Sequence, residues 1–445
     1  MTDMEDFRQV ADAIATEIET GRLRPGDRLP PQRVFARRHG IANSTAARVY
    51  QELTRRGLTV GEVGRGTFVR AATPQQGLAL TEPATSRIDL ELNYPVVPGQ
   101  AKLLADGIGP LLRPDVLESA MRPVGAAGTP QARGAVAELL TRAEWRPDPD
   151  RVLFAGNGRQ AIAAAIAAIV PPGGRLGVEE LTYPVLKAIA ARLGVTLVPL
   201  RIDGAGLDPA AVEAAGPLKA VYLQPTLHNP LSFSMPVERR AELAAVLARL
   251  DLPAIEDSIW SFLREDLPPL AAFAPERTIL VDSLSKRLAA GLSLGFAHMP
   301  GPAVAGVAAA LRSGGWTPMR FALESATRWL TDDTVRSIAQ AKRQDAATRQ
   351  ALAARHLDGF AIQSDPCSYY CWWELPPPWR TDTFVAAAAR HGIAVTPAAA
   401  FAVSGTNASN AIRLGLASPS VPTLSHALAT LAGLARSSPY DLMAE

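Results

Sequence analysis

The chain has 445 residues, too many for a single hydrophobic core, so about two or three domains are expected. A composition of 48% hydrophobic and 20% charged residues excludes a disordered chain and indicates a soluble globular protein. The net charge of +2 conceals an asymmetry, because residues 22–70 hold 11 arginines and three acidic residues, a local charge of +8 that leaves −6 for the rest. A basic segment of this kind indicates nucleic-acid binding.

Three helices are predicted at the N-terminus. Apolar residues recur at helical spacing over residues 7–18. Pro31 suits the first position of a second, short helix. A third helix starts near Asn43 or Ser44, either of which can cap it, and ends at Gly57.

A hairpin follows the helices, because residues 58–60 and 67–69 alternate like strands around a glycine-rich tip. Three helices and a hairpin form a winged helix-turn-helix, whose third helix enters the major groove by its N-terminal end. We expect three residues at this end to face base edges and three arginines to contact phosphates or a groove edge. These residues are Asn43, Ser44, Thr45, Arg33, Arg48 and Arg65.

The segment resembles the DNA-binding domain of GntR-type regulators. The match runs through Arg28-Leu-Pro-Pro-Gln-Arg33, Asn43-Ser-Thr45, Arg48-Val-Tyr50 and Gly64-Arg-Gly-Thr-Phe68. Related regulators often have arginine at the position of Asn43, so the operator sequence stays open.

Residues 71–87 are small, polar and proline-containing, and they predict a linker between residues 1–70 and a second domain, 88–445. From about residue 125 short apolar runs alternate with helical stretches, which predicts a mostly parallel α/β sheet. The predicted strands are 151–154, 175–178, 220–223, 253–256 and 278–281. We expect a large subdomain over about 125–325 and a small one over about 335–440.

Polar motifs follow several of these strands, where open α/β sheets bind ligands. The N–H groups of Gly158, Arg159 and Gln160 open a helix and can hold a phosphate, to which Ser283 and Ser285 can add hydroxyl groups. Each motif alone also has a structural interpretation.

Four further side chains have chemistry that suits a flat cofactor and an acidic ligand. The Tyr183 ring can stack on a flat ring, and the Asn229 amide can donate a hydrogen bond. Asp257 ends a strand, and Arg413 can clamp a carboxylate in two places. Lys286 follows the strand 278–281 in the run Val281-Asp-Ser-Leu-Ser-Lys286.

In this order, the motifs resemble those of fold-type I pyridoxal 5′-phosphate (PLP) aminotransferases over about residues 88–440. The resemblance implies that Lys286 forms a Schiff base with PLP, that Asp257 pairs with the ring nitrogen and that Asn229 donates to the phenolate oxygen. Tyr183 would stack on the ring, and Arg413 would bind the ligand carboxylate.

The chain departs from this family at two positions. Ile259 and Trp260 stand where a cofactor-binding tyrosine is common, and Ser293 stands where an arginine usually anchors the phosphate. Arg287 or Arg159 can substitute for that anchor.

Together, the two halves identify the chain as a member of the MocR subfamily of GntR regulators: a winged helix-turn-helix joined to an α/β fold-type I PLP aminotransferase-like domain. The resemblance implies a homodimer that binds double-stranded operator DNA and changes its affinity when it senses an amino acid, an amine or PLP itself. Two alternatives stay open: an active aminotransferase with an accessory DNA-binding domain, and a cofactor-free dimeric repressor. We do not expect a working enzyme, although a transamination half-reaction stays open.

Cys367 and Cys371, the two cysteines of the chain, exclude a disulfide scaffold and fit a reducing compartment. No second cysteine pair completes a zinc site, so we expect no metal. The polar N-terminus is unlike a signal peptide, and the longest apolar stretch, 161–172, is too short to span a bilayer. A cytoplasmic protein is expected.

Overall fold

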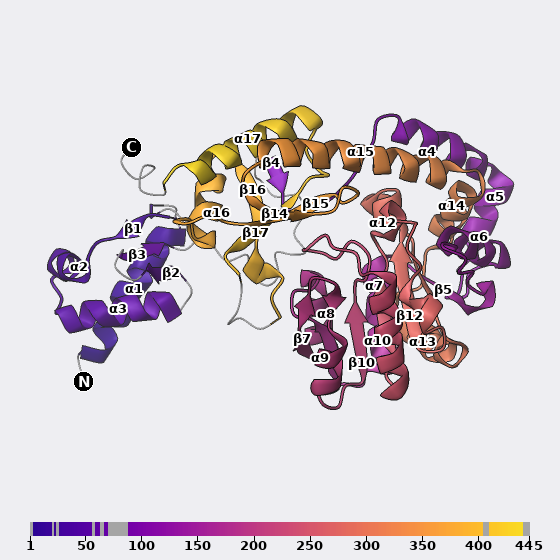
Figure 1. The fold of residues 1–445 in the computed structure, drawn as a ribbon, viewed down its shortest axis with the longest axis horizontal. Helices are drawn as coiled ribbons and strands as arrows, with labels where there is room; N and C mark the ends of the chain where they lie inside the picture. The colour runs from indigo at the N-terminus through magenta and orange to yellow at the C-terminus, as the bar shows by residue number, and fades with distance from the viewer. Residues whose placement is uncertain are drawn as a thin grey trace.

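The computed structural model describes residues 3–19, 22–23, 26–55, 58–62, 66–69, 88–403 and 409–438 (Figure 1). The predicted linker, 71–87, and the wing residue Arg65 lie outside the described residues.

The N-terminal segment folds as the predicted winged helix-turn-helix. Helices α1 (Asp3–Glu19), α2 (Gln32–His39) and α3 (Asn43–Arg55) pack beside a three-stranded antiparallel sheet of order β1-β3-β2. Its strands are β1 (Arg28–Leu29), β2 (Thr59–Glu62) and β3 (Gly66–Val69). Phe35 and Tyr50 meet edge to face in the core, with ring centroids 5.1 Å apart.

Strand β1 is an additional element and pairs with β3. Two local predictions in this segment are corrected. Pro31 is the N-cap of α2 rather than its first residue, since its ψ of 139° is extended. Helix α3 begins at Asn43, so Asn43 and Ser44 lie in its first turn and do not precede it as caps.

A seven-stranded sheet forms the centre of the large subdomain, in the order β5-β13-β12-β11-β10-β6-β7. The strands are β5 (Val152–Ala155), β6 (Arg175–Glu179), β7 (Thr196–Leu200), β10 (Ala220–Leu223), β11 (Ala254–Asp257), β12 (Thr278–Ser283) and β13 (Gly295–His298). Strand β13 runs opposite to the other strands of this sheet. The mostly parallel sheet and all five predicted strands are confirmed, whereas β7 and β13 are additional.

Helices cover both faces of this sheet, which is why the middles of its strands are largely apolar. On one face lie α7 (Gly158–Ile169), α8 (Pro184–Arg192) and α13 (Gly301–Ser313). On the other lie α9 (Pro209–Ala214), α10 (Val237–Arg249) and α11 (Leu270–Phe273), with α6 (Pro130–Leu140) and α14 (Arg320–Thr331) over the β5 side. Helices α4 (Gln100–Ile108) and α5 (Pro114–Ala120) pack on α14.

The small subdomain contains a five-stranded sheet of order β14-β15-β17-β16-β4. Its strands are β14 (Ala361–Ser364), β15 (Tyr370–Glu374), β16 (Ile393–Pro397), β17 (Ala411–Gly415) and β4 (Ile88–Leu90). Strand β4 comes from the start of the second domain and pairs in parallel with β16. Helices α16 (Thr381–Arg390) and α17 (Val421–Arg436) contribute to the core of this subdomain.

The long helix α15 (Thr334–His356) lies across both subdomains (Figure 1). It packs on α4, α14 and the short helix α12 (Leu284–Arg287) at one end, and on α17 at the other. The remaining short elements are β8 (Ile202–Asp203), β9 (Gly206–Leu207), η2 (Gly109–Leu112), η3 (Pro149–Arg151), η4 (Ser261–Leu263), η5 (Ala290–Leu292) and η6 (Ala398–Ala400). Among the described residues, no helix is both long and apolar enough to cross a membrane.

Candidate cofactor and DNA-binding sites

Lys286 and Asp257 come from neighbouring parallel strands of the large sheet. Asp257 is the last residue of β11, and Lys286 lies on α12, directly after β12. The Lys286 Nζ donates a 2.5 Å hydrogen bond to the carbonyl oxygen of Asn93 and faces the rings of Tyr94 and Trp260, 4.6 and 5.4 Å from their centroids. Carboxyl ends of parallel strands share one sheet edge, which is why both residues lie at this edge.

The amine of Lys286 is poised between its charged and neutral forms. Burial lowers the pKa of Lys286 from 10.5 to about 7, and the positive charges of Arg159, Arg413 and Lys342 act in the same direction. A neutral amine is the nucleophile that attacks an aldehyde, so this site supplies it near neutral pH.

Asp257 is buried, with 4% of its surface exposed. Its Oδ2 accepts hydrogen bonds from the Tyr222 hydroxyl at 2.5 Å and the Gln224 amide at 2.8 Å, and its Oδ1 accepts from the N–H of Ile259 at 3.1 Å. Burial raises the pKa of Asp257 to about 6, and the donors oppose this rise. The carboxylate is therefore ionised at neutral pH and can balance a positive charge.

The N-terminus of α7 faces the turn that precedes Lys286. A Cβ added at Gly158 would lie 3.0 Å from the Ser283 Oγ, so a side chain would fill the space between them. The Ser283 and Ser285 hydroxyls are 2.8 Å apart. The Gln160 N–H is already bonded to the Asn157 side chain, which leaves Gly158 and Arg159 as the backbone donors of the predicted phosphate site.

Arg159 and Arg287, the two arginines expected to replace the phosphate anchor, lie in different surroundings. Arg159 is exposed, and its Nε donates to the Tyr183 hydroxyl at 3.3 Å. Arg287 is 3% exposed, pairs with Asp282 at 2.8 Å and lies over the Phe262 ring. The structure thus brings Arg159 to the predicted site and commits Arg287 to a buried ion pair.

Asn229 lies in a polar network behind Asp257. Its backbone N–H donates to Gln224 Oε1 at 3.2 Å, while the Gln224 amide donates to Asp257. The buried Oδ1 of Asn229 has no hydrogen-bond partner among the described residues. Because buried polar atoms are rarely left unpaired, this side chain is available to a bound polar group.

Arg413 extends from β17 and is 7% exposed. Its guanidinium donates to the Glu91 carbonyl and to Thr396 Oγ1, and it lies 5.3 Å from the Phe401 ring centroid. Its Nε is buried and lacks a partner among the described residues. Two bonds of the Nη2 group are thus made by the protein, and the Nε–H is left for an acceptor such as a carboxylate oxygen.

At the two positions where the chain departs from the family pattern, the structure gives different results. Trp260 fills the position of the missing tyrosine, is 4% exposed and packs against Tyr369 and Tyr370. Ser293 has a buried hydroxyl without a partner among the described residues. A phosphate has fewer cationic partners here than the family pattern provides, but the residues still fit one.

Sequence reasoning missed Asn93, Tyr94, Tyr222 and Gln224. Tyr222 stands among apolar residues inside β10 and had no polar signal, although its hydroxyl reaches Asp257. Asn93 and Tyr94 follow β4 and approach Lys286 from nearly two hundred positions away in the sequence. The Asn-Tyr-Pro run at 93–95 was the one local sign of a special segment.

The predicted DNA-contacting residues divide by exposure. Arg33, Asn43, Ser44 and Arg48 are exposed on α2 and α3. Thr45 is 6% exposed, since the third residue of α3 faces the core of the domain. The N-terminal end of α3 therefore offers fewer side chains for contact with base edges than predicted.

The described residues contain no group of three or more His, Cys, Asp or Glu side chains that could hold a metal ion. Cys371 is buried and Cys367 half-buried, and neither forms a disulfide.

Comparisons with known proteins match the N-terminal winged helix-turn-helix and the second domain to two different families. Residues 7–69 match the family of bacterial regulatory proteins, gntR family, and residues 120–431 match aminotransferase class I and II. The chain is 29% identical over 419 residues to the uncharacterized HTH-type transcriptional regulator YdeF of Bacillus subtilis, covering 93% of this chain and 90% of YdeF. It is 25% identical over 408 residues to the vitamin B6 salvage pathway transcriptional repressor PtsJ of Salmonella typhimurium, covering 91% and 93% of the two chains.

A solved structure, that of an archaeal alanine:glyoxylate aminotransferase, aligns with a TM-score of 0.72. The two chains are 21% identical, and the alignment covers 88% of this chain and 94% of the other. At this level of identity the likeness shows the fold alone, and it confirms the α/β fold predicted for the second domain.

Replacing Lys286 by Met should raise the free energy of unfolding of the cofactor-free protein, most strongly below about pH 7. There, folding buries a charged amine that the unfolded chain keeps in water. Between the folded pKa of about 7 and the ordinary 10.5, the folded amine is neutral while the unfolded one is still charged. Stability of the wild type therefore rises with pH in this range, and the advantage of the Lys286→Met variant shrinks.

Urea unfolding at about pH 6 and about pH 9 measures this difference. Lys102→Met, at an exposed lysine, is the control and should show no such trend. If Lys286→Met stabilised the protein equally at both pH values, the lowered pKa of Lys286 would be contradicted.

Proposed function

Because the chain belongs to the aminotransferase class I and II family and carries a gntR-family domain before it, which is the MocR-type arrangement, we propose that it is a PLP-binding transcriptional regulator. The observation that carries this proposal is that Lys286 and Asp257 lie at the same edge of the large sheet, in a chain that also has exposed arginines on a winged helix. An enzyme has no use for the second feature, and a simple repressor has none for the first.

PLP, when bound, supplies an aldehyde and an electron-accepting ring. Lys286 would hold the aldehyde covalently, and Asp257 would keep a proton on the ring nitrogen. Ser283, Ser285 and the N-terminal N–H groups of α7 would bind the phosphate, with Arg159 as the cation. Tyr183 would lie against the ring, and Asn229 would donate to its phenolic oxygen.

The effector is proposed to be an amino acid, with an amine or PLP itself as the alternatives. The buried Arg413 Nε, which has no partner among the described residues, supports a carboxylate-bearing ligand. Arg413 lies on the small subdomain and Lys286 on the large one, so a ligand that touches both favours one arrangement of the two. Only a ligand that binds one arrangement better can change operator affinity.

Wild-type protein with added PLP should develop a visible absorption band that the Lys286→Ala variant lacks, because the covalent linkage needs this amine. Absorption spectra of the two purified proteins measure it. Lys102→Ala serves as the control and should keep the band. No band in the wild type would overturn the PLP proposal and leave a cofactor-free repressor; sustained transamination of amino acids would instead favour an enzyme.

Arg48→Ala should weaken binding to operator DNA and reduce the salt dependence of binding by a slope of about 1, because one phosphate contact is lost. Fluorescence anisotropy at several salt concentrations measures both quantities. Arg192→Ala removes the same charge from an exposed position on helix α8 of the other domain, and it should change neither the affinity nor its salt dependence. An unchanged slope for Arg48→Ala would remove Arg48 from the proposed DNA contacts.

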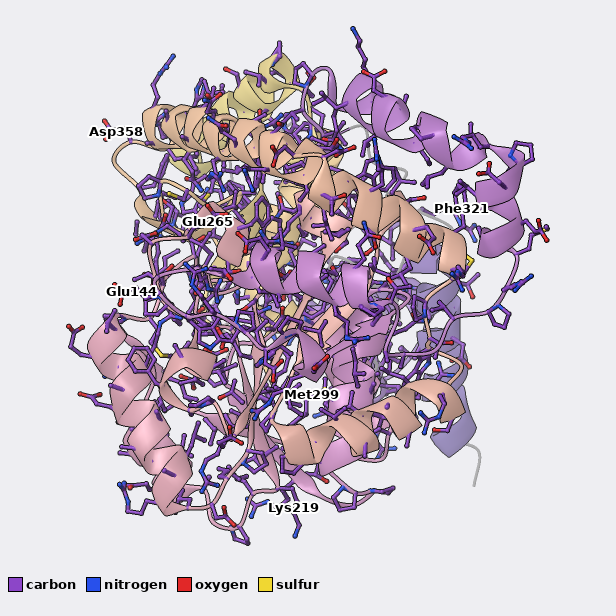
Figure 2. All side chains as sticks on the ribbon, turned by 90° about the vertical axis from the view of Figure 1, so that its right-hand side faces the viewer. Glu144, Lys219, Glu265, Met299, Phe321 and Asp358 are labelled. Atoms are coloured by element: carbon purple, nitrogen blue, oxygen red, sulfur yellow. The ribbon has the colours of Figure 1, made fainter. Side chains whose placement is uncertain are left out.

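The proposed regulator is a homodimer. Helices α4, α5 and α14 and the short η2 pack together and, with the residues beside them, carry exposed apolar side chains. These are Leu103, Leu112, Met121, Met319 and Phe321, which are 37–78% exposed. Figure 2 labels Phe321 on this side of the molecule. Large exposed apolar groups of this kind favour an interface with a second copy.

Phe321→Glu should therefore shift the protein toward monomers, because a charge would be buried at the interface. Sedimentation velocity over a range of protein concentrations measures this shift. Leu250→Glu, an exposed apolar residue at the end of α10, is the matched control. A Phe321→Glu protein that remains as dimeric as this control would place the interface elsewhere.

A further inference from the structure

Lys342 is a fully buried lysine that no step of the proposed chemistry uses. Its exposed fraction is 0%, and its Nζ donates to the carbonyl of Lys286 at 2.8 Å and to the carbonyl of Leu288. These carbonyls lie at the end of α12, the short helix that carries Lys286. Burial lowers the pKa of Lys342 to about 7, and its amine donates to these carbonyls, which the short helix itself leaves unpaired, in either protonation state.

The same turn is held from a second direction. The Gln100 amide also donates to the Leu288 carbonyl, at 3.0 Å, and its Oε1 accepts from the N–H of Val97. Residues 93–100 therefore touch the Lys286 region twice, through the Asn93 carbonyl on its side chain and through Gln100 on its turn. The backbone around Lys286 is fixed by donors from α15 and α4 as well as by its own short helix.

Two helical turns further along, a second buried basic side chain of α15 donates hydrogen bonds to backbone carbonyls, here those of the small subdomain. The Arg349 guanidinium donates to the carbonyls of Leu416 and Pro419 at 2.6 and 2.7 Å, and pairs with Asp345 at 2.7 Å. Leu416 directly follows β17, the strand of Arg413. The step from Lys342 to Arg349 is a rise of about 10 Å along one face of the helix.

Tyr369 lies between the contacts made by Lys342 and those made by Arg349. The Tyr369 hydroxyl lies within hydrogen-bond distance of two acceptors between them, the Lys342 carbonyl at 2.8 Å and the Asp345 carboxylate at 2.9 Å. The Gln350 amide adds bonds to the carbonyls of Ser368 and Tyr370, both at 2.9 Å. Buried polar side chains of helix α15 thus bind the turn of Lys286 at one point, and the start of β15 and the segment after β17 at the next.

We propose that Lys342 is a positioning residue for Lys286. Through α15, it makes the position of the Lys286 backbone depend on the position of β17, the strand that carries Arg413. The proposal rests on the proposed function, in which Lys286 holds PLP and Arg413 binds the effector. A ligand pulling on β17 moves the segment that Arg349 holds, and α15 carries that movement to the carbonyls held by Lys342. A purely structural lysine would stabilise the fold without changing the reactivity of Lys286.

The test is the pH dependence of PLP attachment to Lys286, followed by the visible absorption band in the full-length protein. In Lys342→Met we expect the midpoint to move to higher pH, because a neighbouring positive charge that lowers the pKa of Lys286 is removed. We also expect PLP retention roughly tenfold weaker, because two carbonyls lose their donor. Arg349→Met should move the midpoint in the same direction by a smaller amount.

Arg336→Met is the matched control, since Arg336 is an exposed residue of the same helix paired with Asp333. It should behave as the wild type. A Lys342→Met protein with a lower melting temperature but a wild-type midpoint and PLP retention would overturn the positioning role. An unchanged midpoint in Arg349→Met would overturn the link through α15.

If Lys342→Met does not fold, Lys342→Gln carries the test, because it keeps an N–H donor but removes the charge. An unchanged midpoint in this variant overturns the proposal. Failure of the wild type to develop the band would instead count against PLP binding itself, so the two ideas fail by different observations.

Discussion

Burial of the Lys286 amine is the constraint on which the rest of the site depends. A lysine held away from water loses its proton more easily, and its pKa falls to about 7. The Asn93 carbonyl accepts a hydrogen bond from the amine beside the Tyr94 and Trp260 rings, and nearby positive charges disfavour its ammonium form. A carboxylate beside Lys286 would have stabilised the ammonium form, and none hydrogen-bonds to it among the described residues.

Burial also acts on Asp257, where it raises the pKa of a carboxyl group instead of lowering that of an amine. Burial disfavours the charge of this carboxylate, but Tyr222, Gln224 and the Ile259 N–H restore enough stabilisation for it to ionise at neutral pH. The large sheet therefore presents an amine that readily loses its proton near neutral pH and an anionic carboxylate at adjacent strand ends. That pairing suits a cofactor with an aldehyde at one position and a protonated nitrogen at another.

The two subdomains meet around this pair through contacts to backbone carbonyls. Lys342 of α15 donates to the turn of Lys286, and Lys187 donates to the carbonyls of Ala400 and Ala402. Such contacts are directional, so a small change in the angle between subdomains alters several of them at once. A sensor needs this property more than an enzyme does, because its output is a change of conformation.

The sequence by itself determined the two-part organisation, the winged helix and the strand–helix alternation, which follow from local periodicity. Lys286, Asp257 and Arg413 were singled out because their motifs resemble those of aminotransferases, and their roles stay a prediction. Tertiary structure alone decided that Asn93, Tyr94 and Lys342 reach Lys286, that Thr45 is buried and that Arg287 pairs with Asp282. The physical reason is that hydrogen bonds between distant segments leave no periodic trace, while the burial of one residue depends on every element packed around it.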